Sequence, residues 1–171
     1  MILAFQQTVM AKSFVTFHVP DDPKLLAALG EIALRHEHLN HVLKMTIKVL
    51  ANVTPEEAIS ATRYEGSRQL RERIRKLARS RLGEGTALLR LQALVSECER
   101  VTEARNRYVH GLWAKELDGD PQLRNEFGEP GPVPTVEELS TLAMEIDSVA
   151  QKLNHERLLG FLAEALTAKR L

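Results

Sequence analysis

The stretch "GTALLRLQALVSECERVTEARNRYVHG", residues 85–111, predicts a long amphipathic helix between two glycines. Leu88, Leu91, Val95 and Cys98 recur at spacings of three and four residues, which places them on one face of a helix. Polar and charged residues fill the opposite face. The apolar face must pack against other elements, so the rest of the chain has to supply partners for it.

Two more helical regions come before this stretch. Apolar residues recur at threes and fours from Lys24 to Leu50, at Leu26, Leu29, Ala33, Leu43, Ile47 and Leu50. Thr54 and Glu57 then have the spacing of a capping box, with proline at the first helical position. The helical region that begins there is interrupted at Gly66 and ends near Gly83.

The remaining segments differ in character. Residues 114–134 contain three glycines and four prolines, which exclude a regular helix. Within this excursion "LWAKEL" and "QLRNEF", over residues 112–127, are compatible with a short β-hairpin. A last helix starts at Thr135 and is expected to continue to the end of the chain, whereas residues 1–22 form a strand or an arm.

Composition favours one all-α domain over residues 1–171, a bundle of four to five helices with a loop or hairpin excursion after the third long helix. Apolar residues make up 44% of the chain but aromatic residues only 5%, which suits helix-on-helix packing better than a β-sandwich. The net charge of zero excludes a globally basic nucleic-acid-binding protein, while a local basic patch stays possible.

Cysteine use and the terminal sequence indicate a cytoplasmic protein. Cys98 is the single cysteine, so the chain can form no internal disulfide. The N-terminus lacks the features of a signal peptide, and no apolar run is long enough for a membrane helix. We therefore expect no association with a membrane.

The histidine-rich stretch "RHEHLNH", residues 35–41, raises a metal hypothesis. His36, His38 and His41 do not fit the H-E-x-x-H pattern, and no second cluster completes a ligand set. We interpret these histidines as surface residues and expect no metal site. Phosphate-binding loops, nucleophile elbows and CxxC pairs are also missing from the sequence, so we expect no cofactor.

The end of the stretch quoted first carries the candidate chemistry. His110 and Gly111 are compatible with an ordinary helix C-terminus, where a cation and a glycine are both favoured. Arginine followed five positions later by histidine is uninformative alone. Arg105, Asn106, His110 and Gly111 together, however, are expected fewer than about 0.001 times by chance in a chain of this composition.

This motif, Arg105-Asn106-x-x-x-His110-Gly111 at the end of a long helix, resembles that of the HEPN superfamily. Members of that family are small helical bundles, and many are metal-independent endoribonucleases of toxin–antitoxin and defence systems that dimerise to form the active site. The resemblance covers roughly residues 24–168 and rests mainly on the motif. It implies that Arg105 and His110 are the catalytic pair and that Asn106 is the polar residue that often follows the arginine.

The chemistry of RNA cleavage without a metal is compatible with these residue types. Histidine can transfer protons near neutral pH, and arginine offers a fork for phosphate oxygens. One motif supplies one histidine, whereas removal of the 2′-hydroxyl proton and protonation of the leaving oxygen require two groups. We therefore predict a homodimer with a composite site. Because Arg105 and His110 are about 140° apart around a helix, Arg105 must reach round the helix end or act across the dimer.

A basic segment, residues 67–82, holds seven basic residues and one acidic residue. Arginines on one side of this segment are candidates for contacts with an RNA backbone, namely Arg68, Arg71, Arg75 and Arg79. Arg107, Tyr108 and Trp113 flank the motif and are further candidates, the two aromatic residues by stacking on bases. The alternatives are a solvated helix face for the arginines and core packing for the aromatic residues.

The sequence thus predicts an endoribonuclease that acts on RNA by attack of the 2′-hydroxyl, in a toxin–antitoxin or defence setting. The first alternative is a non-catalytic module of the same fold that binds a nucleotide, RNA or a protein partner. A structural helical protein is the second. Some HEPN toxins carry a tyrosine two residues after the histidine that a nucleotidyltransferase antitoxin modifies. Leu112 stands there in this chain, which argues against that mode of control but leaves an antitoxin partner possible.

Overall fold

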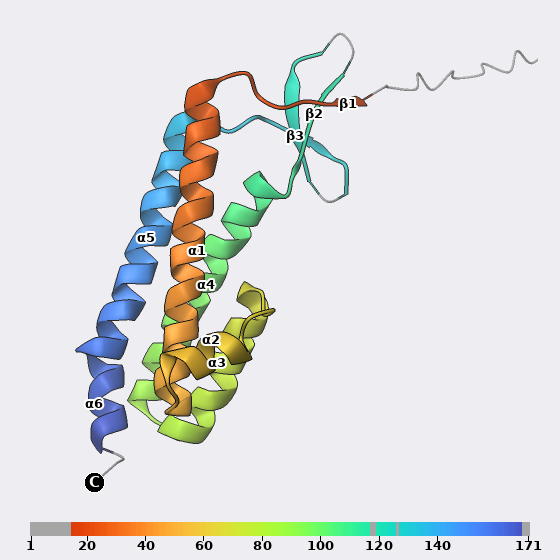
Figure 1. The fold of residues 1–171 in the computed structure, drawn as a ribbon. Coiled ribbons are helices and arrows are strands. Elements are labelled where there is room, and N and C mark those ends of the chain that lie inside the picture. Colours follow the sequence, from red (N-terminus) through yellow and green to blue (C-terminus); the bar gives the residue numbers. More distant parts are fainter. Residues whose placement is uncertain (1–14, 117–118, 126, 169–171) are drawn as a thin grey trace, which may run out of the picture.

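The computed structural model describes residues 15–116, 119–125 and 127–168, and these form a helical bundle with a small sheet at one end (Figure 1). The long helices are α1 (Pro23–Ala51), α3 (Ser67–Leu82), α4 (Thr86–Val109) and α5 (Val136–Leu158), and the short ones are α2 (Pro55–Ala61) and α6 (Phe161–Ala168). The predicted helical bundle is confirmed. No helix in the described part of the chain is long and apolar enough to cross a membrane.

Helix α1 is the central element, because α5 packs along one side of it and α3 along another (Figure 1). Leu43, Ile47 and Leu50 of the predicted stripe are buried, as predicted, whereas Leu26 is 42% exposed. Ile32 and Leu39 are fully buried outside that stripe, so the buried face departs from the predicted one in the first half of the helix. Helices that cover α1 from two sides bury positions outside a single stripe of threes and fours.

The predicted helix starts are confirmed in atomic detail. The Thr54 amide donates to Glu57 Oε2 at 2.8 Å and the Glu57 amide donates to Thr54 Oγ1 at 3.2 Å, which completes the capping box of α2. Thr135 and Glu138 form the same box at the start of α5. Gly66 precedes α3 and Gly83 follows it, as the sequence predicted.

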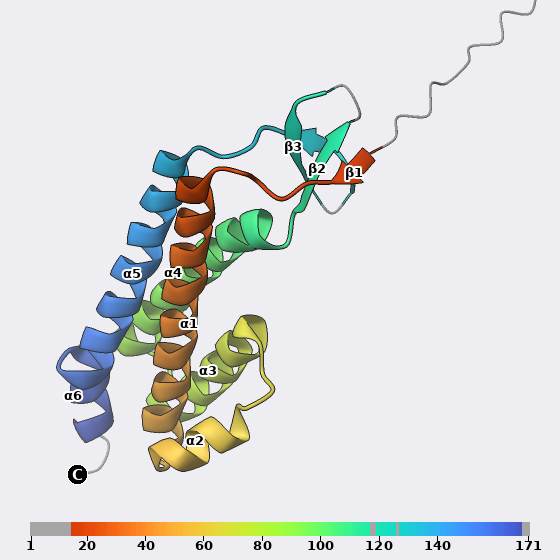
Figure 2. The same ribbon diagram turned by 45° about the horizontal axis from the view of Figure 1, so that its top comes forward.

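The excursion after α4 is a hairpin, as one of the two sequence-based alternatives has it, but it belongs to a larger antiparallel sheet (Figure 2). The order of its strands is β1 (Val15–Phe17), β2 (Leu112–Glu116), β3 (Pro121–Arg124) and β4 (Pro130–Gly131). Strand β1 pairs with β2, which shows that part of the predicted N-terminal arm is a strand. The first 14 residues of the arm lie outside the described part of the chain.

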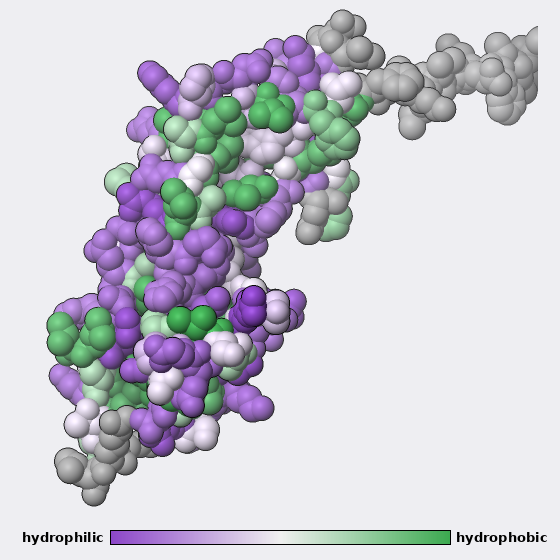
Figure 3. All heavy atoms as spheres, in the orientation of Figure 1, coloured by the Kyte–Doolittle hydropathy of each residue, from purple (hydrophilic) through white to green (hydrophobic). Residues whose placement is uncertain are grey.

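Apolar side chains gather at the sheet end of the molecule, and polar side chains cover much of its middle (Figure 3). Phe17 and Val19 are 87% and 71% exposed, and Phe127, beyond β3, is 81% exposed. Ala114 of β2 and Leu123 of β3 are buried. Because Leu123 pairs with Trp113, the neighbour of Ala114, these two buried side chains lie on opposite faces of the sheet.

The last helix does not continue to the end of the chain, so that prediction is wrong. Helix α5 ends at Leu158, and α6 starts at Phe161. The Glu156 carboxylate accepts a hydrogen bond from the Phe161 amide at 3.0 Å, and a Cβ on Gly160 would collide with Glu156. The glycine lets the chain turn there, and the turn brings Phe161 and Leu162 into the core.

Truncation of Leu39 in α1 should show how much the packing of this helix contributes to the stability of the bundle. Leu39 is fully buried, so Leu39→Ala is expected to lower the free energy of unfolding by about 2–5 kcal/mol. Leu34 lies on the same helix and is 66% exposed, so Leu34→Ala should change it by less than about 0.5 kcal/mol. Urea denaturation of both variants measures the difference, and equal effects would contradict this packing.

Candidate functional site

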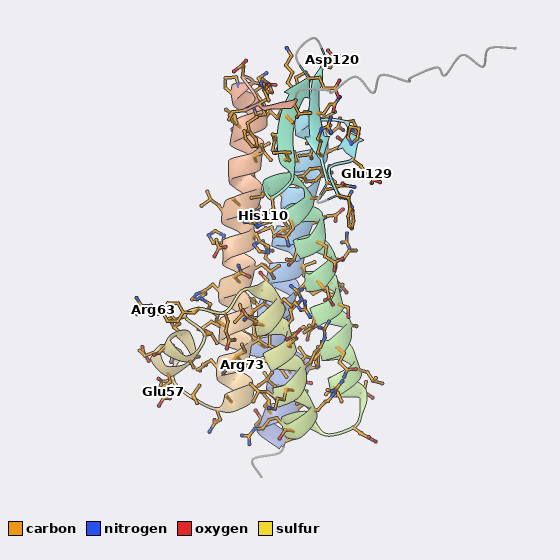
Figure 4. The ribbon with its side chains drawn as sticks, turned by 90° about the vertical axis from the view of Figure 1, so that its right-hand side faces the viewer. Glu57, Arg63, Arg73, His110, Asp120 and Glu129 are labelled. Carbon is orange, nitrogen blue, oxygen red and sulfur yellow. The ribbon has the colours of Figure 1, made fainter. Side chains whose placement is uncertain are left out.

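A pocket of about 750 Å³ lies where α1, the start of α3 and the end of α4 meet. Its walls include Arg105, Asn106 and His110, so the structure brings the three predicted catalytic residues to one cavity. Figure 4 shows His110 at the end of α4, between that helix and α1. Arg71 of α3 and His36 of α1 line the same pocket.

Arg105 reaches round the helix end to its two motif partners within one chain. Its Nη1 atom donates to Asn106 Oδ1 at 3.1 Å and lies 2.9 Å from His110 Nε2. Arginine has donors only, so His110 must accept this bond through the Nε2 lone pair. The long side chain thus spans the angle that separates the two positions on the helix, and Asn106 helps to hold it there.

The junction between α4 and β2 positions His110. His110 is the residue that ends the helix, and its backbone amide donates to the Asn106 carbonyl at 2.9 Å. A Cβ on Gly111 would collide with the Arg107 carbonyl and approach Leu123 Cδ1 to 2.7 Å. Glycine is therefore required at 111 for steric reasons. The expected helix C-terminus is present, and it coexists with a clustered motif.

His36 is a buried residue, so its interpretation as a surface histidine is wrong. Its Nε2 lies 3.3 Å from Thr102 Oγ1 and 3.4 Å from Ser67 Oγ. Both hydroxyl protons are already used, because Thr102 donates to the Cys98 carbonyl at 2.7 Å and Ser67 donates to Asn40 Oδ1 at 2.6 Å. The two hydroxyls can therefore only accept, which places the ring proton on Nε2 and leaves Nδ1 as an acceptor.

The pKa of His36 is lowered to about 4, mainly by burial and to a smaller extent by the nearby positive charge of Arg105. His36 is thus neutral near neutral pH. Its Nδ1 atom is buried and has no hydrogen-bond partner within the described residues. The sequence held a signal for this burial, since Ile32, His36, Leu39 and Leu43 follow one another at spacings of four, three and four residues.

The other two histidines of the same stretch, His38 and His41, are exposed, as predicted. No group of three or more metal-ligating side chains occurs among the residues that the structure describes. Cys98 is buried, and burial raises the pKa of its thiol to about 12. The thiol is therefore a core group, with little thiolate near neutral pH.

Two arginines that line the pocket have buried donors without a partner in the described structure. Burial lowers the pKa of Arg105, against an opposing effect of the Glu37 carboxylate, and Arg105 Nε has no partner in the described structure. Arg71 is only 4% exposed, and neither its Nε nor its Nη1 is hydrogen-bonded there. A buried donor without an acceptor costs about 1–3 kcal/mol. Such donors favour a bound water or ligand that supplies acceptors.

The predicted arginine stripe divides into parts with different surroundings. Arg68 and Arg71 line the pocket, although Arg71 was expected on the surface. Arg75 donates to Glu99 Oε2 at 2.6 Å, and Arg79 is exposed near the opposite end of α3. The first two arginines therefore lie beside the motif, while the other two do not line this pocket.

The flanking candidates point elsewhere. Trp113 Nε1 donates to the Tyr108 carbonyl at 2.9 Å, and both side chains pack partly buried against the core. Arg107 and Tyr108 line a different pocket, of about 600 Å³, between the sheet and the start of α5. The structure thus does not bring these three residues to the Arg105–His110 cluster.

No family model, curated protein or solved structure matches the chain significantly. The candidate site is therefore judged by its geometry. The resemblance to the HEPN superfamily stays a prediction, carried by residues 105–111 and by the helical fold around them.

The buried His36 makes stability depend on pH. The pKa of this ring is about 4 in the folded chain and about 6.5 when unfolded, so acid protonates the unfolded state first. The stabilisation is complete above pH 6.5, is lost as pH falls from 6.5 to 4, and amounts to about 3 kcal/mol. Urea denaturation at several pH values measures it.

His36→Gln tests the origin of this effect, because glutamine keeps a donor near the Nε2 position and cannot titrate. We expect this variant to lose most of the pH dependence between 6.5 and 4 relative to wild type. His41→Gln, at an exposed position of the same helix, should keep it. Identical pH profiles for His36→Gln and wild type would show that His36 is not the responsible group.

Proposed function

We propose that the protein is a metal-independent endoribonuclease of the HEPN type that cleaves RNA at the Arg105–Asn106–His110 cluster. The observation that carries the proposal is the 2.9 Å contact between Arg105 Nη1 and His110 Nε2 at the wall of a polar pocket. The guanidinium of Arg105 can bind a phosphate and the imidazole of His110 can transfer a proton. The two groups are close enough to act on the same phosphodiester. Toxin–antitoxin or other defence systems in the cytoplasm are the proposed setting.

Arg105 and His110 have complementary roles in the proposed reaction. A phosphate that binds Arg105 takes over its donors and releases the Nε2 lone pair of His110. That lone pair then accepts the proton of the 2′-hydroxyl as its oxygen attacks phosphorus. The bond from phosphorus to the 5′-oxygen breaks, which yields a 2′,3′-cyclic phosphate and a 5′-hydroxyl. The guanidinium stabilises the charge on the phosphorane oxygens.

Protonation of the leaving 5′-oxygen needs a second group. His36 is unsuited to this role, because its low pKa keeps it neutral and its Nε2 proton is shared between Thr102 and Ser67. The proposed donor is the protonated His110 of a second copy, in a homodimer whose two motifs face one cleft, and this ring becomes neutral as its proton passes to the 5′-oxygen. An antitoxin that covers this cleft would block both motifs at once.

A non-catalytic module that binds a nucleotide, RNA or a protein partner is the second candidate function. The unpartnered donors of Arg71 and Arg105 support it, because they favour a bound anion whether or not cleavage follows. The two candidates differ in one respect: only the nuclease requires His110 to exchange a proton.

An RNA cleavage assay at neutral pH in excess EDTA tests the nuclease. Wild type should produce fragments with 2′,3′-cyclic phosphate ends, and His110→Ala should lower the rate by about 10²–10⁴-fold through loss of proton transfer. His41→Ala, which removes an exposed histidine outside the pocket, is the matched control and should cleave as wild type does. Inert wild-type protein on single-stranded, structured and transfer RNAs would favour the binding module.

A further inference from the structure

The first turn of α3 lines the pocket beside the motif. Helix α3 is 16 residues long, and its N-cap residue, Gly66, offers no side chain to its free amides. The amides of the first turn have no acceptor within the helix, and the helix dipole adds positive potential there. Gly66, Ser67 and Arg68 all line the cavity. A helix start of this kind favours an anion.

Arg71, one turn further along α3, independently points to an anion at this place. Its side chain is 5% exposed, and its Nε and Nη1 atoms have no partner in the described structure. Its ion pair with Glu99, from Nη2 to Oε1, is long at 3.5 Å. A buried guanidinium with two unused donors beside a helix start needs acceptor oxygens from outside the chain.

Four acidic residues line the pocket, Glu37, Glu72, Glu99 and Glu103, and two of them are paired with arginines. Glu72 pairs with Arg68 at 2.9 Å. Glu99 accepts from Arg75 at 2.6 Å, and this bond holds the pKa of the Glu99 carboxyl below its usual value. Glu99 therefore lies closer to Arg75 than to Arg71. The positive charge of Arg71 is accordingly less fully compensated than that of Arg75.

We propose that the first turn of α3 and Arg71 form a second phosphate subsite, which holds an RNA phosphate adjacent to the one at Arg105 and His110. This inference rests on the proposed function, since it names how the substrate of that site is held. Both groups line one cavity, so two neighbouring phosphates of one strand can occupy it. The substrate is accordingly a polynucleotide, and the subsite sets which of its phosphates meets His110.

Gly66→Asp tests the subsite without threatening the fold. An added Cβ would meet nothing closer than Gln69 Oε1 at 3.7 Å, and the φ of −78° suits aspartate. Aspartate caps a helix well, so this variant should be at least as stable as wild type, while its carboxylate occupies the anion position. Thr54→Asp adds the same charge at the start of α2, outside the pocket, and is the matched control.

The probe is a six-nucleotide RNA with 2′-O-methyl groups, which has all its phosphates but cannot be cleaved. Calorimetry should show that Gly66→Asp raises its Kd at least about tenfold, and that Thr54→Asp leaves it within about twofold. Arg71→Gln should weaken binding in the same direction. Equal affinities for wild type, Gly66→Asp and Thr54→Asp would overturn the subsite.

Two further arms separate this inference from the proposed function. In the first arm, inorganic phosphate is the only ligand. If it binds with the same dependence on residue 66 while the hexamer does not bind, the subsite belongs to a free anion and the RNA assignment is overturned. Cleavage of unmodified RNA by wild type is followed in parallel. Loss of hexamer binding in Gly66→Asp together with an inert wild type would keep the subsite and reject the nuclease.

Discussion

The Nε2 proton of His36 lies between two hydroxyls, those of Thr102 and Ser67, and this shared contact joins α1 to α4 and to α3. Each hydroxyl donates its own proton elsewhere in the helices, so the histidine can engage both only as a donor. The contact therefore requires a neutral ring with a fixed tautomer. His36, Thr102 and Ser67 form a polar layer inside the bundle. Apolar packing around it supplies most of the stability, while the polar layer fixes how the three helices face one another.

The site depends on that arrangement and on the end of α4. Thr102 is buried in the polar layer, and Arg105 follows it by one turn, so the orientation of α4 that serves His36 also turns Arg105 toward the pocket. Gly111 then allows the chain to leave the helix at once for β2. Arg105 can consequently bridge to His110 within one chain, and the first turn of α3 faces the same cavity.

Local signals in the sequence were sufficient for most of the helices, for the capping boxes of α2 and α5 and for the position of the motif, because capping boxes and helical periodicity act within a few residues. They did not reveal the break between α5 and α6. They were insufficient for contacts between distant segments. The pairing of β1 with β2 joins residues about a hundred positions apart, and the buried Arg71 of α3 lies beside Glu99 of α4. His36 fitted the apolar periodicity of α1, but its polar side chain concealed its burial.

Long-range ¹H–¹⁵N correlation of the histidine rings at pH 6 tests most directly whether the polar layer organises the site. Most free imidazoles are charged at this pH, since their pKa is about 6.5. We expect His36 to be neutral at pH 6, with its proton on Nε2 and a lone pair on Nδ1, as its pKa of about 4 requires. A doubly protonated His36, or a neutral ring with its proton on Nδ1, would contradict it.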